Sequence, residues 1–232
     1  MKALESSAKP PPPAGRSIAL RQMAVLSGLI FAVLLCGCAS RAPWQKETFA
    51  FVVPSGDIGS AAHTNILSLK GVTVSALYQG QQFVYRTGEN SYEQDPYAEF
   101  LVPPNRMLEE CLRLCLRNGH AFAEVLDPGS SLEPSCSLEV SVSQLYGDFR
   151  QPDQPFAVVQ MSFLLYSTEP AYRGRVLWQR EFSKCLPLGH RTAVALVAGW
   201  DTDLQQIMEE ANADLTHLAV PEGLPAKKSE QE

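Results

Sequence analysis

The stretch CSLEVSVSQLYGDF, residues 136–149, decides the fold class of this 232-residue chain. Leu138, Val140 and Val142 alternate with one acidic residue and two serines. A period of two residues is typical of a β-strand that turns one face to a core and the other to solvent. The sequence therefore predicts a half-buried strand here, and a sheet to which that strand belongs.

Two more strands and a long helix follow. The segments PFAVVQMSFLLYST (155–168) and RVLWQREFSKC (175–185) repeat the strand pattern, and the turn-like EPAYRG separates them. From about Thr192 to Leu218 the period changes, because apolar residues recur every three or four positions while acidic residues cover the other side. That spacing predicts an amphipathic helix with one buried face.

A first helix is predicted upstream of these strands. Pro103 and Pro104 mark its start, since proline is favoured in the first turn of a helix. Asn118 and Gly119 mark its C-cap. Between these ends, one apolar stripe contains Met107, Leu108, Cys111, Leu112 and Cys115.

Ahead of this helix, the sequence predicts a strand and a hairpin. GVTVSALY (71–78) has β-branched alternation, and QFVYRTG (82–88) with NSYEQDPY (90–97) predicts a pair of hairpin strands. The elements together predict an α+β fold. We expect a single domain with a mainly antiparallel β-sheet and two amphipathic helices that cover one face.

The amino-terminal segment has the three parts of a secretory signal. Arg16 and Arg21 precede the uncharged apolar run MAVLSGLIFAVLL (23–35), and small residues follow it. A helix of that length rises only about 20 Å, too little for the ~30 Å hydrocarbon core of a membrane. Residues 1–37 are therefore predicted to be a lipoprotein signal peptide.

The end of this segment, Leu35-Cys36-Gly37-Cys38, resembles the bacterial lipobox, in which a leucine and two small residues precede a lipidated cysteine. Gly37 directly precedes Cys38, whereas the bulky Leu35 precedes Cys36, so Cys38 is the predicted lipid anchor. The alternatives are an ordinary signal peptide that is cut elsewhere and a short membrane anchor with incidental cysteines. Ala39, rather than aspartate, follows Cys38, which resembles a lipoprotein sent on to the outer membrane.

Composition sets the domain boundaries and excludes one class of partner. We expect a lipid-anchored tether at 38–62, the folded domain at 63–220 and a disordered tail at 221–232. The apolar patch Phe49–Val53 within the tether could form a first edge strand. The chain carries a net charge of −6, which becomes −9 without residues 1–37. No stretch gathers lysine or arginine into a phosphate-binding stripe, so nucleic acid is not an expected partner.

The residues that could carry catalysis form no known motif. None of the four histidines belongs to an H-E-x-x-H pair, and neither a G-x-S-x-G elbow nor a Walker loop is present. Asp201 and Asp203 could bind a cation, but two acids near a helix start are expected to complement the helix dipole. The sequence therefore predicts no enzyme, no metal and no cofactor.

Four cysteines remain in the predicted domain. An exported protein permits disulfides, and four thiols allow three complete pairings. Cys111 and Cys115 lie one turn apart on the apolar face of the first helix, where buried thiols are expected. Cys136 and Cys185 stand at the ends of predicted strands, and a disulfide between them is a pairing that the sequence leaves open.

Aromatic residues cluster around the predicted hairpin and the entry to the first helix. They are Tyr78, Tyr85, Tyr92, Tyr97 and Phe100. Packing in the core or on the sheet is one interpretation. The other is a patch, rimmed by aromatic side chains, that contacts a partner.

The order of these features resembles the ABC-type transport auxiliary lipoprotein family. The resemblance lies in VTVSALYQGQQFVYRTGENSYEQDPYAEFLVPPNRMLEECL, residues 72–112, where the family has a strand, an aliphatic-Val-Tyr-Arg strand and an aromatic residue before a proline. Phe83–Arg86, Tyr92, Phe100 and Pro103 occupy those positions, although the family often has tryptophan at Phe100. The last helix is also similar, so the likeness spans roughly residues 65–218.

The resemblance implies a non-enzymatic periplasmic subunit that is anchored in the outer membrane. Its implied partners are an MCE-domain (mammalian-cell-entry) protein, an ABC permease and an ATPase, which together move phospholipids or other hydrophobic molecules between membranes. Tyr78, Tyr85, Arg86, Tyr92 and Phe100 are the candidate residues for partner contact.

Three alternatives remain open at this point. The first is a stand-alone periplasmic carrier that binds a lipid or lipopolysaccharide in its own cavity. The second is a lipid-anchored hydrolase, for which the sequence offers no nucleophile and base. The third is a structural protein of the cell envelope.

Overall fold

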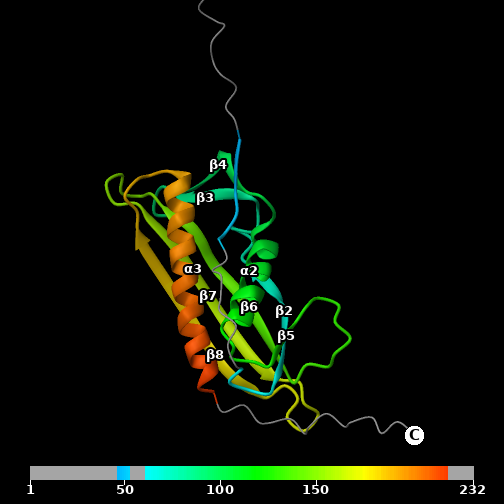
Figure 1. The fold of residues 1–232 in the computed structure, drawn as a ribbon. Helices are drawn as coiled ribbons and strands as arrows, with labels where there is room; N and C mark the ends of the chain where they lie inside the picture. Colours follow the sequence, from blue (N-terminus) through cyan, green and yellow to red (C-terminus); the bar gives the residue numbers. More distant parts are fainter. Residues whose placement is uncertain (1–45, 53–60, 219–232) are drawn as a thin grey trace, which may run out of the picture. The chain divides into compact units, whose positions relative to one another are not determined.

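The computed structural model describes residues 46–52 and 61–218. The predicted signal peptide, the predicted lipid anchor Cys38 and the predicted tail lie outside the described residues. In chain order the elements are β1 (Glu47–Phe49), β2 (Ile66–Val74), β3 (Gln82–Arg86), β4 (Tyr92–Phe100), α2 (Pro104–Asn118), β5 (Glu124–Leu126), β6 (Cys136–Asp148), β7 (Phe156–Ser167), β8 (Val176–Pro187) and α3 (Ala193–Thr216) (Figure 1).

The described strands form one eight-stranded sheet around β6. β7 pairs along one side of β6, and β8 continues the sheet beyond β7. Two strands share the other side of β6, because β2 pairs with its first half and β3 pairs with its end at Gly147 and Asp148. β5 extends the sheet from β2, and β4 and then β1 extend it from β3.

The prediction of a mainly antiparallel sheet is wrong, because the sheet is mixed. Four of the seven strand pairings among the described residues are parallel, namely β1–β4, β2–β5, β2–β6 and β3–β6. The antiparallel pairings join β3 to β4, β6 to β7 and β7 to β8, which are neighbours in the sequence. Apolar alternation shows which face of a strand is buried, but it carries no information on the direction of its partner.

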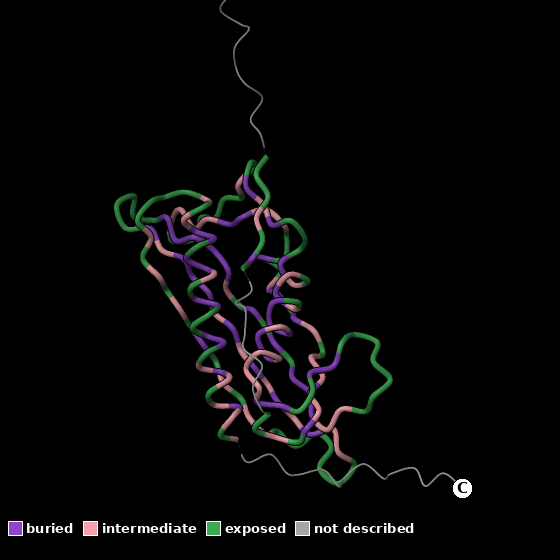
Figure 2. Tube along the Cα trace, viewed as in Figure 1, coloured by how far each residue is buried: buried purple, intermediate pink, exposed green. Residues whose placement is uncertain are grey.

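The prediction of two amphipathic helices on one face of the sheet is confirmed (Figure 1). Pro104 stands in the first turn of α2, and Gly119 is its C-cap. The Thr192 hydroxyl accepts a hydrogen bond from the Ala195 N–H at 3.2 Å and caps the start of α3. Figure 2 shows buried residues along the strands and along the side of each helix that faces them.

An aromatic cluster forms the core at the end of the sheet where β1, β3 and β4 meet α3. The Phe83 ring lies 4.7 Å from Phe100 and 5.1 Å from Trp200, measured between centroids. Phe49 and Phe51 pack at 5.3 Å from Phe83 and Phe100, respectively. Residues 47–51 lie in the range predicted as a tether with a first edge strand, and they do add such a strand, β1, and a buried phenylalanine to the domain.

A β-bulge in β6 changes which of its side chains face the helices. The register with β7 shifts between Val142 and Gln144. Strict alternation from Val142 would have placed Tyr146 on the helix side, but the extra residue turns Leu145 inward and Tyr146 to the opposite face. Tyr146 is therefore available to stack with Tyr78 at 5.7 Å on that face.

Close packing of α3 against the sheet depends on Gly199. A Cβ atom at this position would lie 2.7 Å from Ala157 Cβ and 2.7 Å from Leu188 Cδ2. We expect Gly199→Ala to lower the free energy of unfolding by about 1–3 kcal/mol in urea denaturation, because the helix must move away from β7. Gly189→Ala is the matched control, since no atom lies within 4 Å of its added Cβ, and it should change stability by less than about 0.5 kcal/mol. Equal losses in the two variants would contradict this account of the packing.

Candidate functional site

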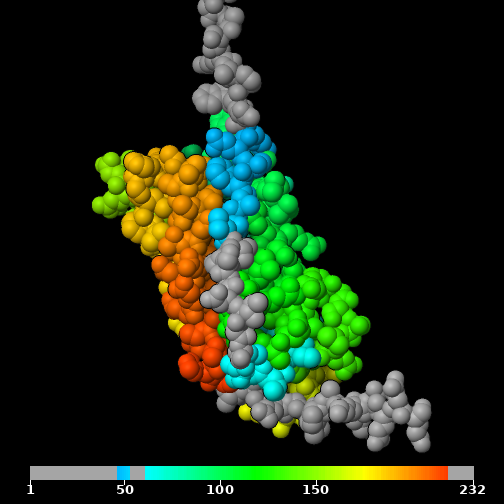
Figure 3. Space-filling view, viewed as in Figure 1, coloured from blue at the N-terminus to red at the C-terminus, as the bar shows by residue number. Residues whose placement is uncertain are grey.

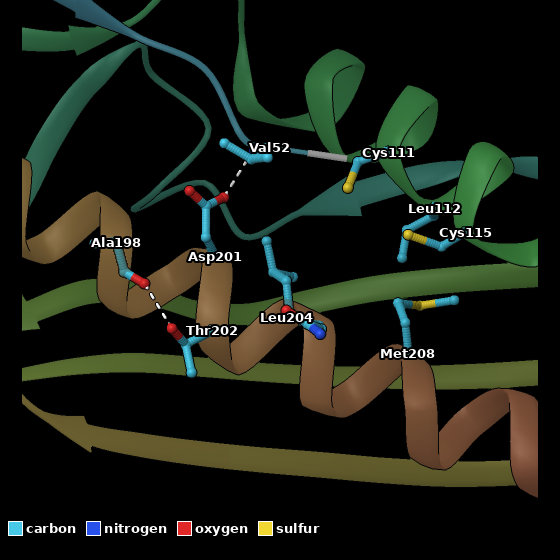
Figure 4. A pocket seen from close by; sticks show the side chains of 10 residues that line it. Val52, Cys111, Leu112, Cys115, Ala198, Asp201, Thr202, Leu204 and Met208 are labelled. Atoms are coloured by element: carbon cyan, nitrogen blue, oxygen red, sulfur yellow. Dashed lines mark hydrogen bonds between the residues drawn. The ribbon is translucent and has the colours of Figure 1, made fainter. Parts of the chain in front are cut away.

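A cavity of about 320 Å³ opens between α2 and α3 (Figure 4). The two helices lie on the same side of the molecule, as Figure 3 also shows. The described residues that line the cavity are Val52, Cys111, Leu112, Cys115, Ala198, Asp201, Thr202, Leu204, Gln205 and Met208. We call this cavity the interhelical groove.

The floor of the interhelical groove is apolar, and its rim is polar. The floor consists of buried residues of the hydrophobic core, namely Leu112 from α2 and Leu204 and Met208 from α3. The polar side chains come from one edge of α3, where Asp201, Thr202 and Gln205 stand next to exposed surface. A mostly apolar cavity with a few polar groups at its rim can hold an apolar group and orient a polar one.

The backbone of residues 51–52 is hydrogen-bonded to both helices. The Phe51 N–H donates to Met107 Sδ of α2 at 3.2 Å, and the Val52 N–H donates to Asp201 Oδ1 of α3 at 3.0 Å. Burial raises the pKa of Asp201, and the hydrogen bond from Val52 offsets part of that rise. The Thr202 hydroxyl donates to the Ala198 carbonyl within α3 at 2.9 Å, so it is already engaged (Figure 4).

The prediction that Asp201 and Asp203 complement a helix start is wrong. α3 begins at Ala193, so both residues lie in its middle turns, where the helix dipole has little effect. The two side chains also point to different places. Asp201 reaches the groove, whereas Asp203 is 1 % exposed beneath the helix.

The four cysteines among the described residues are free thiols, and the disulfide considered between Cys136 and Cys185 is contradicted. Cys136 pairs with Ser167 at one end of β7, while Cys185 pairs with Val158 near the other end. Nine residues of extended strand span about 30 Å, far beyond the ~7 Å limit between Cα atoms of a disulfide. Both cysteines do lie at strand ends, but the antiparallel order of β6, β7 and β8 places those ends apart.

Cys111 and Cys115 are buried, as predicted, but they also line the groove. Their side chains share a hydrogen bond, which raises the pKa of Cys111 together with burial. The same hydrogen bond lowers the pKa of Cys115 against the effect of burial. Both thiols therefore stand on the wall that α2 contributes to the cavity.

The five residues predicted to contact a partner do not form one exposed surface. Phe100 is 3 % exposed in the aromatic core, and Tyr78 is 4 % exposed, so neither can form a contact surface as predicted. Tyr85 stacks on Phe149 at 4.6 Å, and its hydroxyl donates to Asp95 Oδ2 at 2.5 Å. For Tyr85, Arg86 and Tyr92, contact with a partner stays a prediction.

Three of these five residues do meet, around Tyr146. Tyr78 and Tyr92 lie 5.7 Å and 6.0 Å from the Tyr146 ring, and the Arg86 guanidinium lies 5.9 Å from the Tyr92 ring. Burial raises the pKa of Tyr78 to about 12, so its hydroxyl stays protonated at neutral pH. Sequence reasoning missed Tyr146, because nothing in its spacing signals the bulge that exposes this face.

Sequence reasoning also missed the groove as a site, although it found the apolar stripe on α2 that contributes one wall. Val52, Gln205 and Met208 carry no motif, and only the packing of α2 beside α3 brings them together. Among the described residues, no group of three His, Cys, Asp or Glu side chains could hold a metal ion. None of the described helices combines the length and the apolarity that a membrane span requires.

Comparison with known proteins supports the same fold. The structure is similar to that of protein XCC0632 from Xanthomonas campestris, of the DUF330 family, with a TM-score of 0.61 and 17 % identity over 73 % of this chain and 95 % of that one. An uncharacterised protein is also similar, with a TM-score of 0.54 and 18 % identity over 72 % of this chain and 99 % of that one. The curated proteins gave no match.

Sequence comparison gives the family. The family described as the ABC-type transport auxiliary lipoprotein component matches residues 51–212. The match begins at Phe51 beside the groove and ends near the last turn of α3, so it includes β2 to β8, α2 and most of α3. This is a family of transport auxiliary proteins rather than of enzymes. The resemblance seen in the sequence is thereby confirmed: the chain belongs to the ABC-type transport auxiliary lipoprotein family.

Proposed function

We propose that the protein is the auxiliary lipoprotein of an MCE-type ABC transport system, anchored by lipid at Cys38 in the outer membrane and facing the periplasm. It acts as a docking and structural subunit, without catalysis of its own, for an MCE-domain protein with its permease and ATPase. The cargo is a phospholipid or another hydrophobic molecule. The observation that carries this proposal is the family match over residues 51–212.

The position of Cys38 in the chain supports anchoring close to the membrane. Eight peptide steps separate Cys38 from Lys46, the first described residue. Even a fully extended chain covers at most about 29 Å over that length. A lipid on Cys38 would therefore keep the domain near the membrane surface. Several acyl chains are needed for firm anchoring, and a bacterial lipoprotein carries them.

The test is purification from crosslinked cells in mild detergent, followed by mass spectrometry of the co-purified proteins and of the amino terminus. We expect an MCE-domain protein and an ABC permease, with lipid on Cys38. Cys38→Ala should move the protein from the membrane fraction to the soluble fraction. Cys185→Ala, which removes an exposed thiol elsewhere, should leave membrane attachment unchanged. An unmodified Cys38, or recovery of this protein alone, would contradict the proposal.

A second candidate function is a stand-alone carrier of lipid or lipopolysaccharide, and the apolar floor of the interhelical groove favours it. Ala198→Phe separates the two functions, since Ala198 is exposed and lines the groove, so a larger side chain fills it from the rim. Gln206→Phe is the control, because Gln206 is exposed on α3 but is not among the lining residues. Loss of co-purified lipid in Ala198→Phe alone would favour the carrier. Unchanged lipid, with the transport proteins retained, would favour the docking subunit.

A further inference from the structure

Sulfur-bearing side chains gather between α2 and α3. The described residues contain seven of them, and three line the interhelical groove: Cys111, Cys115 and Met208. A fourth, Met107, stands one turn before Cys111 and contacts the backbone of Phe51 through its sulfur. The transport role proposed above does not account for this concentration of sulfur between the two helices. Aliphatic side chains would make the floor of the groove equally apolar.

The two cysteines are arranged as a pair of ligands. They are four residues apart on α2, so their side chains project from the same face of the helix. Both side chains line the groove, so the two sulfur atoms belong to the same wall of the cavity. Met208 approaches from α3, and Figure 4 shows its side chain beside Leu112 and Cys115 in the groove. Both walls of the groove thus contribute sulfur.

We propose that Cys111, Cys115 and Met208 form a binding site for a soft monovalent metal ion of the Cu(I) class. Two thiolates and one thioether are the donors that such an ion prefers. On binding, both thiols lose their protons to solvent, and each thiolate sulfur gives an electron pair to the metal. The Met208 thioether adds a neutral third ligand. No oxidation state changes in this step.

The donor set disfavours the divalent ions that are common in proteins. Structural zinc takes four ligands in a tetrahedron, usually from cysteine and histidine. Within the described residues no third His, Cys, Asp or Glu joins the two thiols in a suitable group. Magnesium and calcium prefer oxygen ligands, whereas the floor here is apolar. A low-coordinate soft cation fits two thiolates and a thioether better than any of these.

The test uses the full-length chain with Cys36→Ser, Cys38→Ser and Cys185→Ser, so that only three thiols remain: Cys111, Cys115 and Cys136. Cu(I) is titrated against a chromophoric Cu(I) chelator under anaerobic conditions. We expect one equivalent to bind. Cys111→Ser or Cys115→Ser should weaken binding at least about 100-fold, and Met208→Leu about 10-fold. Cys136→Ser is the matched control, because this thiol is equally buried in β6 but lies outside the groove, and it should leave binding unchanged.

A second measurement needs no substitution in the site. In the folded chain, one equivalent of Cu(I) should slow the alkylation of Cys111 and Cys115 more than that of Cys136, relative to the metal-free protein, as measured by peptide mass spectrometry over hours of reaction. X-ray absorption of the complex should show sulfur as the nearest neighbours of the metal. Failure to compete with the chelator would overturn the proposal, and so would equal binding by the Cys111→Ser/Cys115→Ser double variant. Neither result depends on whether the protein belongs to an MCE-type system.

Discussion

Trp200→Ala is expected to lower the free energy of unfolding by about 3–5 kcal/mol, the largest loss that we predict for one side chain. Trp200 is fully buried and is among the largest side chains in the core. Its ring lies 5.1 Å from Phe83 of β3 and 5.5 Å from Phe100 of β4, so it joins α3 to the sheet. Alanine would leave a cavity at this junction, because three elements cannot all move inward to fill it.

The measurement for Trp200→Ala is urea denaturation followed by far-UV circular dichroism, which does not depend on tryptophan fluorescence. Trp178→Ala is the matched control. Trp178 is partly buried on β8, and its Nε1–H donates to Asp214 Oδ2 at 3.3 Å. We expect a loss of about 1–2 kcal/mol for the control, from partial burial and one hydrogen bond. Equal losses for the two tryptophans would show that Trp200 is not the centre of this junction.

Asp203→Asn is expected to change how stability depends on pH. Asp203 is 1 % exposed beneath α3, and its Oδ2 atom has no hydrogen-bond partner among the described residues. Burial raises the pKa of this carboxyl from 3.8 to about 6, although Lys184 opposes part of the rise. The charged form is disfavoured in the fold, because a carboxylate that leaves water without a partner loses its hydration.

The sign of the effect follows from the raised pKa. Between about pH 4 and pH 6 the folded protein keeps the Asp203 proton while the unfolded chain has lost it, so stability falls as pH rises through this window. A shift from 3.8 to about 6 corresponds to a loss of about 3 kcal/mol, of which about 0.5 kcal/mol is present at pH 4 and all is present above about pH 7. Asparagine does not ionise. The difference in unfolding free energy between variant and wild type should therefore move by about 2.5 kcal/mol in favour of the variant from pH 4 to pH 7.5.

Urea denaturation at several pH values gives that difference, and Asp201→Asn provides the comparison. Burial also raises the pKa of Asp201, but this side chain reaches the groove and accepts a hydrogen bond from Val52. We expect the same direction and a smaller change for Asp201→Asn. Parallel stability curves for wild type and Asp203→Asn would mean that Asp203 is charged in the folded protein, in contradiction to its burial.

The helices could be predicted well because their signals are local. Pro104 is the first residue of α2, and Gly119 directly follows its last residue. Thr192 directly precedes the apolar repeat of α3, and its hydroxyl caps that helix. Each signal depends on residues within one or two turns, so no knowledge of distant neighbours is needed. The hairpin of β3 and β4 was predictable for the same reason, since only a short turn joins its strands.

The sheet direction and the candidate sites could not be predicted in this way. β2 and β6 pair in parallel although α2 and three strands lie between them in the sequence. Tyr146 reaches the face of Tyr78 only because of a bulge, and Phe100 is core rather than surface because Trp200 comes from α3 to cover it. Each of these outcomes depends on a contact between residues far apart in the chain, about which short-range spacing is silent.

The sequence by itself determined the family, the two helices and the buried faces of the long strands, because periodicity and caps act over a few residues. It also predicted Cys38 as the lipid anchor, which lies outside the described residues and stays a prediction. Only the tertiary structure decided which strands run parallel. It also decided that Cys136 of β6 and Cys185 of β8 pair with residues near opposite ends of β7, and that Cys111, Cys115 and Met208 share one groove. The physical reason is that local patterns fix which face of an element is buried, whereas close packing between elements selects the partners that bury it.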